Sequence, residues 1–120
     1  MAANQLETRV QHLPGVAIIE LHGEINAFAE QALNAAYGDA CMASPGAILL
    51  DFSGVDYINS TGIALIVSLM SKARQANCRL MACGLSDHYQ EIFTITRLSD
   101  FMNIYPDRAA ALKTVQATAA

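Results

Sequence analysis

A short apolar run followed by a helix start constrains the fold of this chain more than any other sequence feature. Residues 47–50 read Ala-Ile-Leu-Leu, which is typical of a buried strand, and residues 51–54 (Asp-Phe-Ser-Gly) follow it as a turn. After a loop at residues 55–58, Asn59 and Ser60 carry side chains of the helix-capping type, directly before apolar residues at helical spacing. The pattern predicts a central strand joined by a short loop to a helix that begins at about Ser60.

The predicted central helix has an apolar stripe and an apolar flank. Spacing of i, i+3, i+4 and i+7 predicts which residues pack on the sheet. These are Ile63, Ile66, Val67, Met70 and Ala73. Leu65 and Leu69 lie on the flank of that stripe. Two interpretations stay open: the two leucines widen the buried face, or they form a small apolar patch beside the helix N-terminus where a partner docks.

Composition and charge exclude several classes of function. A chain of 120 residues that is 53% hydrophobic and 15% charged predicts one domain over residues 1–120. The net charge of −4, with no run of lysines or arginines, argues against direct contact with nucleic acid. No segment approaches the roughly 18 consecutive apolar residues of a membrane span, and the first residues lack a secretory signal pattern. We therefore expect a cytoplasmic protein without membrane insertion.

The sequence carries no motif of a metal, a cofactor or a catalytic centre. Cys41, Cys78 and Cys83 are odd in number and form no C-x-x-C pair, so we expect three small core residues rather than a zinc site or a disulfide framework. A P-loop and a dinucleotide-binding fingerprint are both absent. Ser60 lacks the G-x-S-x-G context of a hydrolase nucleophile, since Ile58 stands two residues before it. The protein is therefore not expected to be an enzyme.

The remaining patterns complete an alternation of strands and helices. Pro14-Gly15 predicts a turn between two strands, at residues 8–13 and 16–22. A helix over residues 27–41 should follow Asn26 as its cap, with a sheet-facing side formed by Phe28, Ala32, Leu33, Ala35 and Ala36. The later elements are a strand at residues 78–84 parallel to the central strand, a helix at 88–96, an edge strand at 102–105 and a last helix from 106. The order is β-β-α-β-α-β-α-β-α.

This order, together with residues 51–63 (Asp-Phe-Ser-Gly-Val-Asp-Tyr-Ile-Asn-Ser-Thr-Gly-Ile), resembles the STAS family, the domain of sulfate transporters and anti-sigma factor antagonists. The resemblance covers nearly the whole chain and is supported by Gly23, by Cys83-Gly84-Leu85 and by residues 101–105. It implies an α/β fold of the STAS (SpoIIAA-like) type, with a four- to five-stranded mixed sheet and about four helices.

The resemblance also implies a function. Small stand-alone members of the family bind an anti-sigma factor serine kinase, which phosphorylates a serine or threonine at the start of the central helix and thereby ends the binding. By position, the acceptor falls on Ser60, with Thr61 as second choice. The family usually has an aspartate directly before the acceptor, where this chain has Asn59. From its local sequence alone, Ser60 also reads as a plain N-cap residue.

The sequence thus predicts an anti-sigma factor antagonist that acts by partner switching. Its partner-binding residues are predicted to be Asp56, Asn59, Thr61, Gly62, Leu65 and Leu69. A weak homodimer could form through an exposed edge strand or through the flank of Leu65 and Leu69. The alternative is a STAS accessory or ligand-binding subunit of a transport or sensory complex that is not phosphorylated.

Overall fold

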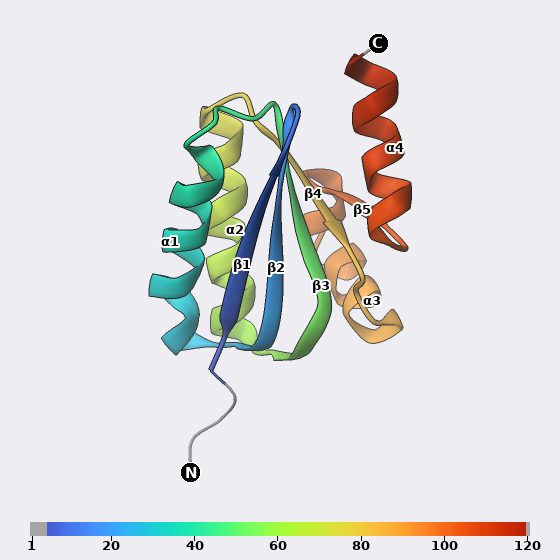
Figure 1. Cartoon of the computed structure of the whole chain (residues 1–120). Helices are drawn as coiled ribbons and strands as arrows, with labels where there is room; N and C mark the ends of the chain where they lie inside the picture. The colour runs from blue at the N-terminus through green and yellow to red at the C-terminus, as the bar shows by residue number, and fades with distance from the viewer. Residues whose placement is uncertain (1–4, 120) are drawn as a thin grey trace.

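A five-stranded sheet lies at the centre of the computed structural model, which describes residues 5–119 and the side chains of residues 5–115. The strands are β1 (Glu7–Leu13), β2 (Val16–Ile25), β3 (Ala47–Ile58), β4 (Arg79–Cys83) and β5 (Asn103–Tyr105). The helices are the 3-10 turn η1 (Ala27–Ala29), α1 (Glu30–Cys41), α2 (Ser60–Gln75), α3 (Asp87–Ile95), the 3-10 turn η2 (Leu98–Asp100) and α4 (Arg108–Ala119). Helices α1 and α2 cover one face of the sheet, and α4 lies on the other (Figure 1).

Strand pairing confirms the predicted mixed sheet. β1 and β2 form an antiparallel hairpin around Pro14-Gly15, and the pairs β2–β3, β3–β4 and β4–β5 are parallel. In a parallel sheet the carboxyl ends of neighbouring strands meet at one edge. The junctions from β2 to η1, from β3 to α2 and from β4 to α3 therefore lie at the same end of the molecule, at the bottom of Figure 1.

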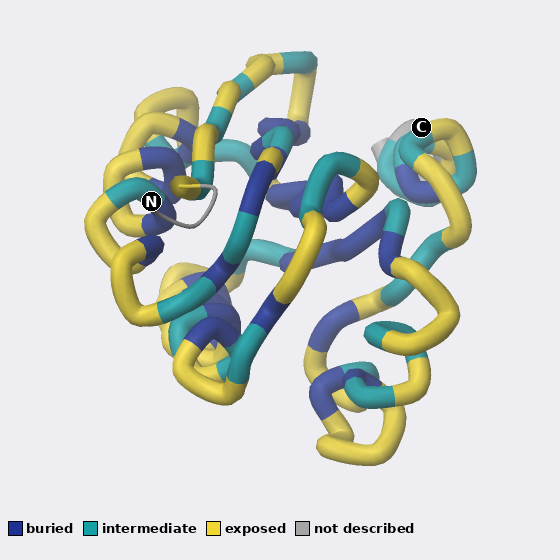
Figure 2. Tube along the Cα trace, turned by 90° about the horizontal axis from the view of Figure 1, so that it is seen from below, coloured by how far each residue is buried: buried dark blue, intermediate teal, exposed yellow. Residues whose placement is uncertain are grey.

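Buried side chains form a core on each face of the sheet. The larger core joins alternate residues of β2 and β3, such as Ile19 and Leu50, to the inner sides of α1, α2 and α3. The smaller core joins Ile18 and Leu49 to Ala111 of α4. The tube drawn in Figure 2 shows buried positions along the strands and the inner sides of the helices, and exposed positions on the turns. Among the described residues, no helix is long and apolar enough to cross a membrane.

The first predicted helix begins differently from the expectation. Asn26 does cap it, since its Oδ1 accepts a hydrogen bond from the Phe28 backbone nitrogen at 2.9 Å, but the chain first makes the 3-10 turn η1. A 3-10 turn has three residues per turn, so it shifts the phase of the α-helix that follows. The predictions that Phe28 and Ala35 face the sheet are therefore wrong: Phe28 is 89% exposed, and Ala35 is exposed too. The buried residues of η1 and α1 are Ala29, Leu33, Ala36, Tyr37 and Ala40.

The central strand is longer than predicted. β3 continues through residues 51–58, which the sequence indicated to be a turn and a loop, because β2 extends to Ile25 and pairs with it. The register between the two strands shifts twice, between Glu20 and His22 and between Gly23 and Glu24. Such irregularities bend a strand without ending it. Residues 51–54 are therefore part of the sheet.

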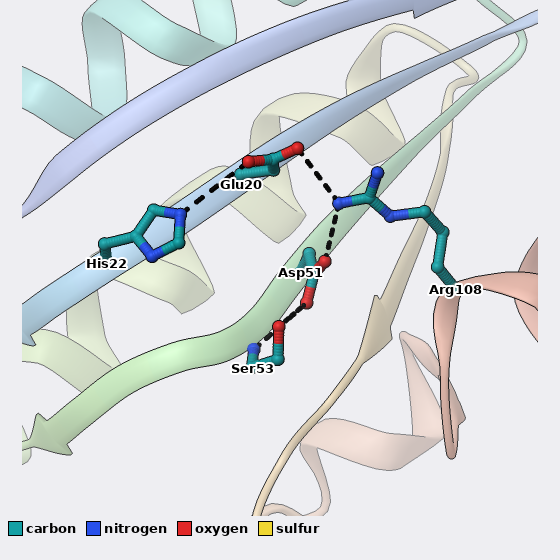
Figure 3. A network of polar contacts seen from close by, with 5 residues as sticks. All are labelled: Glu20, His22, Asp51, Ser53 and Arg108. Carbon is teal, nitrogen blue, oxygen red and sulfur yellow. Dashed lines mark hydrogen bonds and ion pairs between the residues drawn. The ribbon is translucent and has the colours of Figure 1, made fainter.

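A polar network explains how Asp51 can lie inside a strand (Figure 3). Arg108, the first residue of α4, donates from Nη2 to Asp51 Oδ2 at 2.7 Å and to Glu20 Oε2 at 3.1 Å. Ser53 donates to Asp51 Oδ1 from its backbone nitrogen at 3.0 Å and from Oγ at 2.7 Å. His22 Nε2 lies 3.7 Å from Glu20 Oε1. The carboxylate of Asp51, which is 8% exposed, thus has partners for both oxygens.

Candidate functional site

The start of α2 is built by a cap and by a bond to the neighbouring strand. Asn59 has an extended backbone, and its Oδ1 accepts a hydrogen bond from the Gly62 backbone nitrogen at 2.8 Å. The Asn59 backbone nitrogen donates to the Ile25 carbonyl oxygen at 3.2 Å, which fixes the helix start against the end of β2. The prediction that the helix begins at about Ser60 is confirmed. The interpretation of Ser60 as the N-cap is wrong, because Asn59 holds that position.

Ser60 and Thr61 are both exposed, as the first two residues of α2. The first N–H groups of a helix have no intrahelical acceptor and carry the positive end of the helix dipole. No acidic side chain stands in the first turn of α2. Both hydroxyls therefore lie on the surface, at a place that favours a negatively charged group.

Tyr89 holds the end of β3 in place, a role that the sequence patterns did not indicate. The Tyr89 hydroxyl of α3 accepts a hydrogen bond from the Ile58 backbone nitrogen at 2.9 Å and lies 3.4 Å from the Ile58 carbonyl oxygen. Ile58 directly precedes the cap residue Asn59. Tyr89 thus positions the start of α2 from a helix that lies 31 residues further along the chain. A residue so distant in sequence gives no local signal of this role.

Two of the predicted partner-binding residues are structural. Gly62 is buried, and a Cβ atom there would collide with the Ile25 carbonyl oxygen, so glycine permits the close approach of α2 to β2. Leu69 is 1% exposed and belongs to the larger core. The prediction that Gly62 and Leu69 contact a partner is therefore wrong, because neither offers a side chain to the surface. Leu65 is half-buried and packs on the same core, as the interpretation of a widened buried face expected.

Two exposed aromatic residues belong instead to the segments that adjoin the start of α2. Phe28 belongs to η1, which packs against β2 and α2, and it is 89% exposed. Tyr57, the penultimate residue of β3, is 51% exposed and stands three residues before Ser60. Asp56 is exposed as well. We call Phe28, Asp56, Tyr57, Ser60 and Thr61 the α2 N-terminal surface. Phe28 could not be recognised from the sequence, because its spacing matched the buried side of an uninterrupted helix.

The described residues show no group that could hold a metal. Within residues 5–119, no cluster of three His, Cys, Asp or Glu side chains has that geometry. Cys83 is buried, and burial is the main cause that raises the pKa of its thiol to about 12. Cys41 and Cys78 are half-buried free thiols. The prediction of three small core residues is confirmed for Cys83, while Cys41 and Cys78 pack against the larger core but are only partly buried.

Comparison with known proteins settles the family. The STAS domain family matches over residues 7–111. This chain belongs to the STAS domain family. The sequence resemblance is thereby confirmed, and so is the predicted SpoIIAA-like fold.

Relatives of this STAS domain carry the name of anti-sigma factor antagonists. BtrV of Bordetella bronchiseptica, a candidate anti-sigma factor antagonist, is 28% identical over 115 residues, which cover 91% of this chain and 97% of BtrV. An anti-sigma factor antagonist from Mycobacterium paratuberculosis has a similar crystal structure, with a TM-score of 0.81, 24% identity, and coverage of 96% and 97% of the two chains. The Bacillus cell fate determinant SpoIIAA in its phosphorylated form aligns with a TM-score of 0.70 at 18% identity, covering 91% of this chain and 99% of SpoIIAA.

Proposed function

We propose that this STAS domain is an anti-sigma factor antagonist that binds an anti-sigma factor serine kinase through the α2 N-terminal surface. Phosphorylation of Ser60 by that kinase ends the binding. Family membership and the names of the relatives support the antagonist role. The phosphorylated form of SpoIIAA, which has the same fold, supports a switch of this kind.

One observation carries the choice of Ser60. The hydroxyl of Ser60 is exposed, and the cap of α2 is already supplied by the side chain of Asn59. Phosphorylation of a capping serine would change the hydrogen bond that holds the helix start. Because Ser60 is not the cap, its Oγ can accept a phosphate while the bond from Gly62 to Asn59 stays in place. Thr61 is exposed at the second helical position and is the second choice.

The phosphate acts on the docking surface rather than on the fold. It adds roughly −1.5 to −2 charges and three acceptor oxygens. The N–H groups of the first turn can hold part of this charge without refolding the domain. A partner that covers Phe28 and Tyr57 would have to bury the phosphate beside them, next to the carboxylate of Asp56, and burying an uncompensated charge is costly.

The same account indicates which residues of this chain contribute most to partner binding. Phe28 and Tyr57 offer large exposed apolar areas, 89% and 51% exposed, and aromatic residues supply much of the energy at protein interfaces. Docking of a partner would remove that area from water. We therefore assign binding to the two aromatic side chains and release to the hydroxyl of Ser60 on the same surface.

The test compares charge at Ser60 with the same charge elsewhere on α2. Ser60→Ala should bind the purified anti-sigma factor kinase as the wild type does and stay bound with ATP. Ser60→Asp should bind at least about tenfold more weakly, as expected for a charge brought into an interface. Ser68→Asp is the matched control, because Ser68 is exposed on the same helix, two turns further along. Affinities are measured by isothermal titration calorimetry.

Intact mass identifies the acceptor. Incubation with the kinase and ATP should add the mass of one phosphate to the wild type and none to Ser60→Ala. A phosphate on Ser60→Ala that disappears in the double variant with Thr61→Ala would move the switch to Thr61. Equal binding of Ser60→Asp and wild type would refute the switch, and co-purification with a membrane complex without any phosphate would favour the accessory-subunit alternative.

A further inference from the structure

A cavity of about 400 Å³ lies at the other end of α2. Its walls come from the C-terminal half of α2, from the start of β4 and from the segment between η2 and β5. Its volume falls within the range of about 300–1,000 Å³ that is typical of small-molecule sites. Arg74, on its wall, lies 14 residues after Ser60, which is about 20 Å along a helix at 1.5 Å per residue. The cavity is thus separate from the α2 N-terminal surface.

The walls of the cavity are largely apolar and partly exposed. Phe101 is 62% exposed, and Val67, which the sequence predicted to pack on the sheet, is 43% exposed. Met70 and Leu80, which also line the cavity, are buried. Large apolar side chains of this kind keep area in contact with water that a bound apolar body would cover. The aromatic ring of Phe101 further favours a flat ligand, because aromatic rings gain from stacking or edge contacts.

Two guanidinium groups line the same cavity. Arg74 lies over the Phe101 ring, with Cζ 5.7 Å from the ring centroid, and Arg79 donates from Nη2 to the Tyr105 hydroxyl at 3.1 Å. Within the described part of the chain, neither arginine forms an ion pair with a carboxylate, whereas Arg97 and Arg108 both do. The cavity therefore offers two positive charges that no acidic side chain of residues 5–115 pairs with.

The remaining lining does not oppose a negative charge. No Asp or Glu is among the described residues that line the cavity. Cys78 does line it, and burial raises the pKa of the Cys78 thiol, which keeps this group neutral at pH 7. Asn103 adds an amide that can donate. In a chain of net charge −4, two arginines that no acidic side chain of residues 5–115 pairs with make this cavity locally positive, which favours an anionic ligand.

We propose that this cavity binds a small aromatic carboxylate. The flat ring lies against Phe101 and Val67, and the carboxylate accepts hydrogen bonds from Arg74 and Arg79. Guanidinium groups suit this role because their planar N–H donors match the two oxygens of a carboxylate. The proposal does not depend on the switch at Ser60, since it uses none of the residues of the α2 N-terminal surface.

The experiment uses 1-naphthoate as the probe, with 1-naphthamide as its neutral counterpart of the same shape. Titration of the folded protein is followed by two-dimensional NMR of the backbone amides and by calorimetry. We expect saturable binding of 1-naphthoate, with shifts concentrated at residues 67–74, 78–80 and 101–103. The amide should bind about tenfold more weakly or worse, since it cannot form charge-assisted hydrogen bonds.

Variants assign the binding to this cavity. Arg74→Gln and Arg79→Gln should each weaken the affinity for 1-naphthoate by about tenfold. Phe101→Ala should weaken the affinities for 1-naphthoate and 1-naphthamide alike, because it removes the apolar contact that both ligands share. Arg9→Gln is the matched control: Arg9 is an exposed arginine of β1 outside the cavity, and its loss should leave the affinity unchanged. The amide spectrum of each variant shows whether it has folded.

Three results would overturn the proposal. They are the lack of saturable shifts at the cavity, equal affinity for 1-naphthoate and 1-naphthamide, and equal weakening by Arg9→Gln and by the two cavity variants. None of them bears on the kinase experiment, because Ser60→Asp leaves every residue of the cavity intact. The two proposals can therefore fail separately.

Discussion

The Arg108 guanidinium donates a 2.7 Å hydrogen bond to the carboxylate of Asp51, 57 residues earlier in the chain. This contact joins the first residue of α4 to the middle of β3. Asp51 is 8% exposed, so its charge would be costly to bury without a partner. The bond therefore both permits Asp51 in the sheet and holds α4 against the second face of the sheet.

Replacing this arginine should destabilise the fold. Arg108→Gln leaves Asp51 and Glu20 without their shared cation, and we expect a loss of about 2 kcal/mol in the free energy of unfolding at pH 7. Urea unfolding followed by circular dichroism measures the difference. Arg97→Gln is the control, because the ion pair of Arg97 with Asp100 is exposed and should be worth less than about 1 kcal/mol. Equal losses in the two variants would contradict the structural role of Arg108.

The same network predicts how stability depends on pH. The hydrogen bond from Arg108 lowers the pKa of Glu20. Burial alone would raise the pKa of Asp51, but the hydrogen bonds from Arg108 and Ser53 outweigh it and lower this pKa as well. A carboxyl group with a lowered pKa in the native state adds stability above its unfolded pKa and loses it as the pH falls through the native pKa. Wild-type stability should therefore fall below about pH 4, and more steeply than that of Arg108→Gln.

The capping side chain of α2 gives a third prediction. Asn59→Ala removes the acceptor of the Gly62 N–H and should cost about 1 kcal/mol. Asn59→Asp keeps an acceptor and adds a negative charge at the positive end of the helix dipole, so it should be at least as stable as the wild type. Thermal unfolding of the three proteins at one pH and salt concentration decides this. An Asn59→Asp protein as unstable as Asn59→Ala would show that the side chain does not act as the cap.

Two glycines within helices, Gly62 and Gly38, allow a controlled comparison of the same substitution. Ala at Gly62 would place its Cβ against the Ile25 carbonyl oxygen, and backbone cannot yield as a flexible side chain does, so Gly62→Ala should cost about 2–4 kcal/mol. Gly38 lies in α1, where a Cβ would meet no atom within 4 Å, so Gly38→Ala should gain up to about 1 kcal/mol from helix propensity. Opposite signs in urea unfolding are expected. A Gly62→Ala protein at least as stable as the wild type would contradict the close approach of α2 to β2 at Gly62.

Local sequence patterns predicted the elements of this fold but not the contacts between distant ones. The hairpin, the cap at Asn26, the start of α2 and the parallel pairing of β3 with β4 all depend on neighbouring residues, and all are confirmed. The predicted end of β3 was wrong because the strand continues by pairing with β2 as far as Ile25, and the partners that accommodate the Asp51 carboxylate in the sheet include Arg108, which lies outside any local window. The prediction that Phe28 faces the sheet was wrong because one 3-10 turn changed the helical phase.

The candidate site was predictable to a similar extent. The capping pattern predicts which residues stand at the start of a helix, and Ser60 and Thr61 are indeed exposed there. Asp56, just before the helix, is exposed too, as a docking surface requires. Gly62 and Leu69 were predicted to lie on the docking surface but are buried, because the angular position of a residue on a helix does not say how wide the buried face of that helix is. That width is set by the neighbours: α2 packs against α1 as well as the sheet. The contribution of Tyr89 likewise depends on tertiary structure alone.

The two leucines on the flank of α2 provide the sharpest comparison of core and surface. Leu69 is 1% exposed within the larger core, so Leu69→Ala should lose about 3 kcal/mol of stability through lost burial and the cavity that it leaves. Leu65 is half-buried, so Leu65→Ala should lose less, about 1 kcal/mol. Both values come from urea unfolding, with Val67→Ala, an exposed position of the same helix, as the control.

Binding separates the two roles of these leucines further. Leu69→Ala should keep its affinity for the partner kinase under conditions in which it is fully folded, because its side chain never reaches the surface. Leu65→Ala can weaken binding only through its exposed part, by less than Phe28→Ala, whose ring is 89% exposed. Calorimetric titration of folded Leu65→Ala, Leu69→Ala and Phe28→Ala ranks the three. A larger loss of affinity for folded Leu69→Ala than for Phe28→Ala would place the docking surface on the flank of α2 after all.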